Sequence, residues 1–133
     1  MKEIVRLDHD AARRTLTARL LCELDHHAAK EAREEIDRAF RETAPDLLAL
    51  DFSGVSFMDS SGVGLILGRL SLCAAAGARM EIVGVSQATL RLLRMAGLQR
   101  MPGLKIRAAE DDGRQNEILR QESRREEERI ARS

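Results

Sequence analysis

The segment FMDSSGVG, residues 57–64, holds the side chains best suited to chemistry in this sequence. In it Asp59, Ser60, Ser61 and Gly62, here called the seam, stand directly before an apolar stretch with helical spacing. A loop that enters a helix places its hydroxyls beside free backbone N–H groups, so one serine can cap the helix. The positive end of a helix also tolerates a phosphate. The seam therefore predicts either a plain helix cap or a serine that switches binding when it is phosphorylated.

Other chemistries fit the sequence less well. No G-x-S-x-G motif surrounds the two serines, and all three histidines lie near the N-terminus, which argues against a hydrolase. Asp25, His26 and His27 suggest a metal, but adjacent histidines on a helix point about 100° apart, so a helix cap with a polar first turn is favoured. No glycine-rich phosphate loop occurs. We therefore expect no catalytic residue, no metal and no cofactor.

The composition limits the class of partner. A chain of 133 residues with 44% hydrophobic residues suits one domain with a real core. Aromatic residues make up only 2%, and the 22 basic and 22 acidic residues balance, so neither nucleic acid nor an anionic membrane is expected as a partner. Cys22 and Cys73 lie in apolar segments and are expected to be reduced, buried thiols. No apolar stretch approaches the roughly 18 residues of a membrane span, so a cytoplasmic protein is expected.

Strand-like and helix-like segments alternate along the chain, which predicts an α/β fold with a partly parallel sheet. The first two strands are expected to form a hairpin with a turn at residues 8–14. Asp25 and Ser86 are expected to cap helices. The expected strands are residues 3–7, 15–21, 47–52, 80–85 and 104–106, and the expected helices are residues 26–42, 62–76 and 87–96.

The chain divides by composition near residue 107. We expect a domain over residues 1–107 and a charged tail, helical or disordered, over residues 108–133. The tail is interpreted as a solubilising segment or as a helix that binds a partner or associates with a second copy of itself.

The helix expected at residues 62–76 has two apolar sides. The expected core stripe contains Val63, Ile66, Leu67, Leu70, Cys73 and Ala74. Leu65 and Leu72 lie nearly opposite this stripe, together with Ala76 and flanked by Arg69. The pattern has two interpretations: an exposed strip that docks a protein beside the serines, or a helix that is buried on more than one side.

Three stretches carry a family resemblance: CELDHHAA at residues 22–29, ALDFSGVSFMDSSGVGLILGRL at 49–70, and VGVSQATLRLLRMAGL at 83–98. Over roughly residues 3–107 the chain resembles the bacterial STAS-domain anti-sigma-factor antagonists, including those that regulate sporulation. The resemblance implies a small mixed β-sheet with helices mainly on one side. The family usually has glycine where this chain has Cys22, so a positive φ there would require a reshaped loop.

The resemblance also implies a mechanism. An antagonist of this kind is a regulator and not an enzyme: it binds an anti-sigma factor that is also a serine kinase, and the sigma factor is released. The kinase, with its own bound ATP, phosphorylates a serine of the seam, the phosphoprotein dissociates, and a PP2C-type phosphatase resets it. By position the target is Ser60, with Ser61 as the alternative.

The residues expected to bind the partner are Glu23, Asp25, Asp59, Ser61, Gly62, Leu65, Arg69 and Leu72. Two other functions remain open: a STAS scaffold module of a larger signalling assembly, and a ligand-binding STAS domain.

Overall fold

The computed structural model describes residues 3–109, which form a five-stranded sheet in the order β1-β2-β3-β4-β5. Strand β1 runs antiparallel to β2, and the remaining neighbours are parallel, so the sheet is mixed as predicted. The strands are β1 (Val5–Asp10), β2 (Thr15–Leu20), β3 (Leu47–Asp51), β4 (Arg79–Val85) and β5 (Leu104–Ala108).

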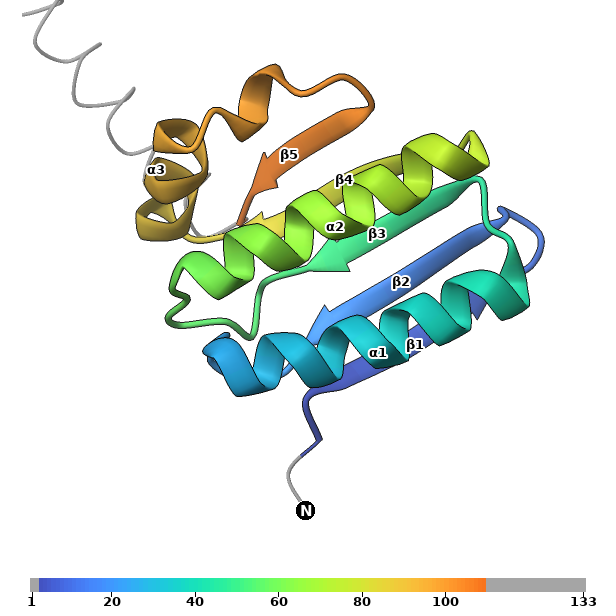
Figure 1. Ribbon diagram of the computed structural model, residues 1–133, viewed down its shortest axis with the longest axis horizontal. Coiled ribbons are helices and arrows are strands. Elements are labelled where there is room, and N and C mark those ends of the chain that lie inside the picture. The colour runs from blue at the N-terminus through green and yellow to red at the C-terminus, as the bar shows by residue number, and fades with distance from the viewer. Residues whose placement is uncertain (1–2, 110–133) are drawn as a thin grey trace, which may run out of the picture.

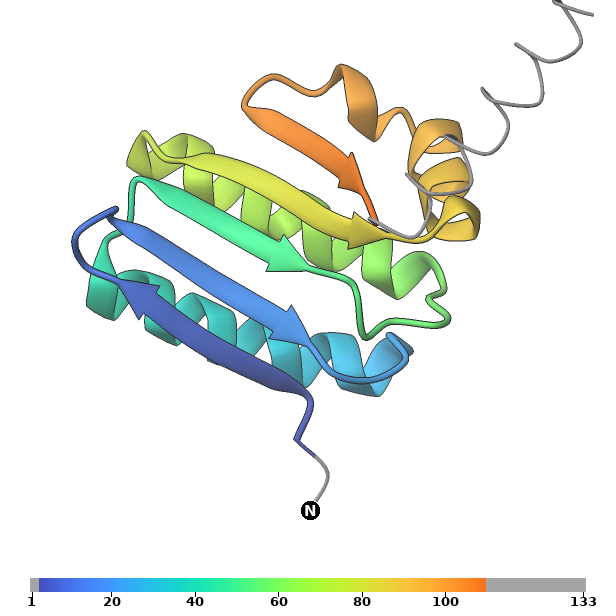
Figure 2. The ribbon, with the colours of Figure 1, turned by 180° about the vertical axis from the view of Figure 1, so that it is seen from behind.

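Two long helices, α1 (His26–Thr43) and α2 (Ser60–Ala76), lie side by side on one face of the sheet, as Figure 1 shows. Figure 2 shows the molecule from behind. The sheet lies in front of both helices, and no described element covers its other face. Helix α3 (Gln87–Met95) and the 3-10 turn η1 (Leu98–Arg100) follow β4 and precede β5. The expected arrangement, with helices mainly on one side, is confirmed.

The core lies between the two long helices and the sheet. Side chains alternate along a strand, so the helix-facing positions of β2, β3 and β4 supply fully buried residues such as Leu16, Leu48 and Ile82. Helix α1 presents small residues and two large ones to them, because positions three and four apart share one face. These are Ala28, Ala29, Ala32, Ile36 and Phe40.

The uncovered face of the sheet is polar and charged. Arg19 and Asp51 lie on it at 4.0 Å, and Arg107 pairs with Glu81 at 3.5 Å. One-face burial explains why β2 alternates between buried and more exposed positions.

The hairpin differs from its prediction. Strand β1 continues to Asp10, three residues beyond the expected end, because Asp8 and Asp10 pair with Thr17 and Thr15 of β2. Polar residues are tolerated there since their side chains lie on the uncovered face of the sheet.

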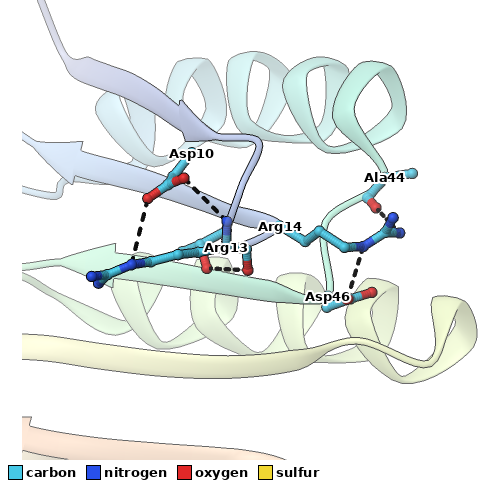
Figure 3. Close-up of polar contacts among 6 residues, drawn as sticks. Asp10, Arg13, Arg14, Ala44 and Asp46 are labelled. Atoms are coloured by element: carbon cyan, nitrogen blue, oxygen red, sulfur yellow. Dashed lines mark hydrogen bonds and ion pairs between the residues drawn. The ribbon is translucent and has the colours of Figure 1, made fainter.

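The hairpin turn is tied to the loop between α1 and β3, at the end of the molecule remote from the seam (Figure 3). Arg14 Nε lies 2.8 Å from Asp46 Oδ2, and the Asp46 N–H donates to the Arg14 carbonyl at 2.8 Å. Within the turn, the Arg13 N–H donates to Asp10 Oδ1 at 3.1 Å. These contacts fix the amino end of the parallel strands.

Two elements near residue 100 differ from their expected bounds. Helix α3 ends at Met95, one residue before its expected end, and Met95 is 81% exposed, whereas Thr89 and Leu93 are the buried residues of this helix. Strand β5 extends to Ala108, two residues beyond the expected end of the last strand, and the Ala109 N–H donates to the Val85 carbonyl at 3.0 Å. The rest of the expected tail lies outside the described residues, so the division into domain and tail stays a prediction.

Candidate functional site

Two segments that are far apart in the sequence meet beside the first turns of α1 and α2 (Figure 1). The Leu24 N–H donates to the Phe57 carbonyl at 3.0 Å, and the Asp59 N–H donates to the Leu24 carbonyl at 3.3 Å. Leu24 and Met58 form an isolated parallel bridge. The carboxyl ends of neighbouring parallel strands meet at one edge of a sheet, so the loops after β2 and β3 are brought together there.

The loop after β3 is held against β4 by a glycine. Gly84 has φ +71°, and a Cβ on it would lie 2.9 Å from the backbone nitrogen of Ser53. The Phe52 N–H donates to the Val83 carbonyl at 2.8 Å just after the strand. Only glycine permits this approach, which places the start of the loop that leads to the seam.

The aspartate of the seam, and not one of its serines, caps helix α2. Helix α2 begins at Ser60, and the extended Asp59 accepts a hydrogen bond from the Ser61 N–H at 2.7 Å. The expectation that a serine caps this helix is therefore wrong, because the carboxylate of Asp59 already occupies the cap. Ser60 is exposed, and its hydroxyl makes no hydrogen bond to any residue between 3 and 109.

The two glycines near the seam differ. Gly62, expected at the docking surface, is buried, and a Cβ on it would lie 2.7 Å from the sulfur of Met58. It serves the packing of the seam against its own loop. Gly64 is exposed, and a Cβ on it would meet nothing within 4 Å.

The interpretation that the apolar strip of α2 is exposed and docks a protein is wrong. Leu65 is 4% exposed and Arg69 is 7% exposed, while Leu72 is half-buried and packs against the core. Helix α1 covers this side of α2, which a helical wheel of α2 alone does not reveal. The second interpretation, a helix buried on more than one side, is confirmed. Ala76 of the expected strip is exposed, and Leu67 and Ala74, expected in the core stripe, are exposed as well. The other exposed residues of α2 are Ser60, Gly64, Ser71 and Ala75.

Arg69 joins the two helices through a buried ion pair. Its Nε lies 2.7 Å from Asp37 Oδ1, but the angle falls outside hydrogen-bond geometry. Burial lowers the pKa of Arg69, the Asp37 carboxylate opposes this change, and the neighbouring Arg33 lowers the pKa further. Arg69 therefore positions α2 against α1.

Glu23 and Asp25 line one hollow beside α1. Asp25 caps the helix as predicted, since its Oδ1 accepts from the Ala28 N–H at 2.8 Å. The hollow has a volume of about 690 Å³ and is also lined by Cys22, His27 and other residues of the adjoining loops. Among the described non-glycine residues only Arg14 and Ala44 have positive φ, so Cys22 replaces the family glycine without that strain.

Ser61 lines a second hollow, of about 490 Å³, between α1 and α2. Its other lining residues are His26, Ala29, Lys30, Arg33, Gly64 and Leu65. The structure thus separates Glu23 and Asp25 from Ser61, which lie on two sides of the first turns of α1.

The sequence interpretation missed two features of this region. Lys30 and Arg33 are brought to the seam by the packing of α1 on α2, and their spacing of three residues was the available signal. Phe57, one of three phenylalanines in the chain, is 55% exposed two residues before the seam. Its position close to the two serines was the available signal.

Both cysteines are free of disulfides. Cys73 is buried as predicted, and burial raises the pKa of its thiol to about 11. Cys22 is half-buried, less than expected. Between residues 3 and 109 no cluster of three or more potential metal ligands occurs, and none of the helices there is long and apolar enough to cross a membrane.

Comparison with known proteins identifies the family. Residues 7–113 match the model of the STAS domain. An anti-sigma F factor antagonist of Paenibacillus polymyxa is 36% identical over 94 residues, which cover 71% of this chain and 80% of that protein. This chain belongs to the STAS-domain family of anti-sigma-factor antagonists. Members of the family are non-enzymatic regulators that act by partner switching.

Two solved structures of such antagonists share the fold. The unphosphorylated form of the anti-sigma factor antagonist SpoIIAA matches with a TM-score of 0.66 and 34% identity, over 82% of this chain and 91% of that one. SpoIIAA of Bacillus in its phosphorylated form matches with a TM-score of 0.61 and 33% identity, over 84% of this chain and 97% of that one. The predicted family and the predicted α/β STAS fold are confirmed.

Proposed function

We propose that this STAS protein binds an anti-sigma factor with serine kinase activity, and that phosphorylation of Ser60 releases it. The observation that carries the proposal is the seam: an exposed serine hydroxyl at the first position of α2, free because Asp59 caps the helix. The existence of a relative in a phosphorylated form supports a switch of this kind. The partner supplies ATP, a PP2C-type phosphatase removes the phosphate, and the cycle takes place in the cytoplasm.

Ser60 is preferred over Ser61 as the target for a physical reason. A kinase must reach the hydroxyl, and Ser60 is exposed while Ser61 is half-buried between the two helices. A phosphate at the first turn also faces free N–H groups and the positive end of the helix. The modification therefore changes the surface without unfolding α2. Ser61 remains the alternative.

We define the docking surface as Phe57, Asp59, Ser60, Gly64 and Leu67. Phe57 and Leu67 are 55% and 37% exposed and offer the apolar contact that anchors protein interfaces. The missing side chain at Gly64 lets a partner backbone approach α2 closely. Glu23 and Asp25 adjoin this surface through the hydrogen bonds of Leu24.

Four of the residues expected to bind the partner lie beneath the docking surface. They are Leu65, Arg69, Leu72 and Gly62. The first three pack α2 against the rest of the fold, and Gly62 packs the seam against Met58. Substituting them is expected to change binding only by moving α2 or the seam.

The phosphate releases the partner through bulk and charge. Phosphoserine carries about −1.5 to −2 charge at neutral pH. Beside Asp59 it creates a concentrated negative patch in the middle of the docking surface. A partner that fits the neutral serine then meets both a steric obstacle and repulsion of any acidic group at the interface.

Kinase assays on single variants test the proposal. The protein is mixed with a cognate anti-sigma kinase and ATP, and the phosphate is located by mass spectrometry. Ser60→Ala is expected to abolish modification, whereas Ser71→Ala, at another exposed serine of α2, leaves it unchanged. Phosphorylation that persists in Ser60→Ala and is lost in Ser61→Ala would transfer the role to Ser61.

Binding and size measurements complete the test. Ser60→Asp is expected to weaken binding to the anti-sigma factor by at least about tenfold, a difference of about 1.4 kcal/mol. A stable large homo-oligomer in sedimentation, with no exchange on phosphorylation, would instead support the scaffold alternative.

A further inference from the structure

The hollow between α1 and α2 is unusually basic for a neutral chain. Three of its lining residues, His26, Lys30 and Arg33, carry or can carry positive charge. Among the described residues that line it there is no carboxylate, although the whole chain has equal numbers of acidic and basic residues. The neighbouring hollow beside α1 contains Glu23, Asp25 and Glu31. Helix α1 thus separates an acidic side from a basic side at its first turns.

Positive charge extends from this hollow into the helix interface. Arg33 lies near enough to Arg69 to act on its ionisation, so two guanidinium groups share this side of α1. Among the described groups that act on the ionisation of Arg69, Asp37 is the one carboxylate, and it is paired with Arg69. No described ion pair or hydrogen bond engages the side chains of Lys30 or Arg33. The basic hollow therefore has unneutralised charge available for an anion.

The seam stands at the rim of the basic hollow. Ser61 lines it directly, and so does Gly64, which is one helical turn after Ser60. Residues four apart on a helix are neighbours on its surface. Ser60 does not itself line the hollow, but a Cβ on Gly64 would meet nothing within 4 Å, so the space beside Gly64 is open. Lys30 and Arg33 line the same hollow from α1.

We propose that the basic hollow is an intramolecular receptor for the phosphate carried by Ser60, with Lys30 and Arg33 as its principal cations and His26 as a third when protonated. The inference rests on the proposed phosphorylation of Ser60 and adds how the modified state is held. The phosphate crosses Gly64 and pairs with α1, so it covers the glycine surface of α2 that the partner needs. Arginine and lysine contribute a planar fork and a point charge, respectively, both suited to phosphate oxygens.

Titration of a site-specific phosphoserine tests this proposal without any kinase or anti-sigma factor. Phosphoserine is incorporated at position 60 during translation, and its second ionisation is followed by 31P NMR. The two cations favour the dianion and the neighbouring Asp59 carboxylate disfavours it. Because the proposal has both cations in contact with the phosphate, its second pKa is expected to lie roughly 0.5 units below the usual value of about 6 at low salt. The shift is expected to shrink in high salt, since exposed pairs are screened over about 10 Å at 0.1 M.

Matched double variants distinguish the effect of the hollow on the phosphate pKa from the effect of the helix end. Lys30→Gln with Arg33→Gln is expected to remove most of the pKa shift, whereas Arg38→Gln with Arg41→Gln removes the same charge from exposed positions of α1 outside the hollow and leaves the shift unchanged. An unshifted pKa at position 60, or an equal shift in both double variants, overturns the proposal. A shift seen only with phosphoserine at position 61 also overturns it. Failure of Ser60→Asp to weaken partner binding, by contrast, overturns the proposed function and leaves this titration unaffected.

Discussion

The different roles of Asp59 and Ser60 lead to a prediction about the thermal stability of the fold. Asp59 caps α2 and Ser60 does not, so replacing each of them by alanine must change the stability by different amounts. Asp59→Ala removes the acceptor of the 2.7 Å bond from the Ser61 N–H and also a negative charge at the positive end of α2. Ser60→Ala removes an exposed hydroxyl that bonds to nothing among residues 3–109.

The expected magnitudes follow from this geometry. Loss of an N-terminal cap costs about 1 kcal/mol, and loss of the favourable charge adds about 0.5 kcal/mol. For a domain of this size, 1 kcal/mol corresponds to about 4 °C in melting temperature, so Asp59→Ala is expected to melt about 6 °C lower. Ser60→Ala is expected to stay within about 0.5 kcal/mol, or about 2 °C, of the parent protein.

Circular dichroism during thermal and urea unfolding measures both variants. Asp59→Asn is the control, because its side-chain oxygen can still accept from the Ser61 N–H and only the charge is lost. Asp59→Asn is therefore expected to fall between the parent and Asp59→Ala. A loss in Ser60→Ala as large as in Asp59→Ala would refute the reasoning, because Ser60 would then be a structural residue and not a free acceptor of phosphate.

Three further predictions test the surfaces around the seam. Gly64→Ala is expected to stabilise the fold by about 0.5–1 kcal/mol in thermal unfolding, since the added Cβ meets nothing and alanine favours helix, yet to weaken partner binding in calorimetry. Arg69→Met is expected to lower the free energy of unfolding in urea by about 3 kcal/mol by leaving Asp37 unpaired, and adding Asp37→Leu should restore most of it. Cys73, whose thiol pKa is raised from 9.0 to about 11 by burial, ionises more readily when unfolded, so stability is expected to fall as pH rises from 9 towards 11. In urea unfolding, the free energy of unfolding of Cys73→Ala should fall less over this pH range than that of the parent protein.

Much of the architecture was predictable because local signals agreed with the fold. Asp25 and Ser86 act as the predicted caps, accepting from the Ala28 and Thr89 N–H groups at 2.8 and 3.2 Å. The apolar run of β3 lies in the interior of the sheet, between β2 and β4. Local pattern failed at β1, where polar residues continue the strand because the partner strand, and not the residues themselves, decides how far pairing extends.

The candidate site divides in the same way. The sequence by itself determined that two serines stand at the start of a helix, because residue types and their order suffice for that. Only the tertiary structure decided which residue caps α2, which side of α2 is exposed and which cations stand beside the seam. The last two depend on the packing of α1 against α2: it buries Leu65 and Arg69, leaves Gly64 open, and brings Lys30 and Arg33 to residues about thirty positions away. A helical pattern records that a face is apolar, but the neighbouring helix determines whether that face meets solvent or protein.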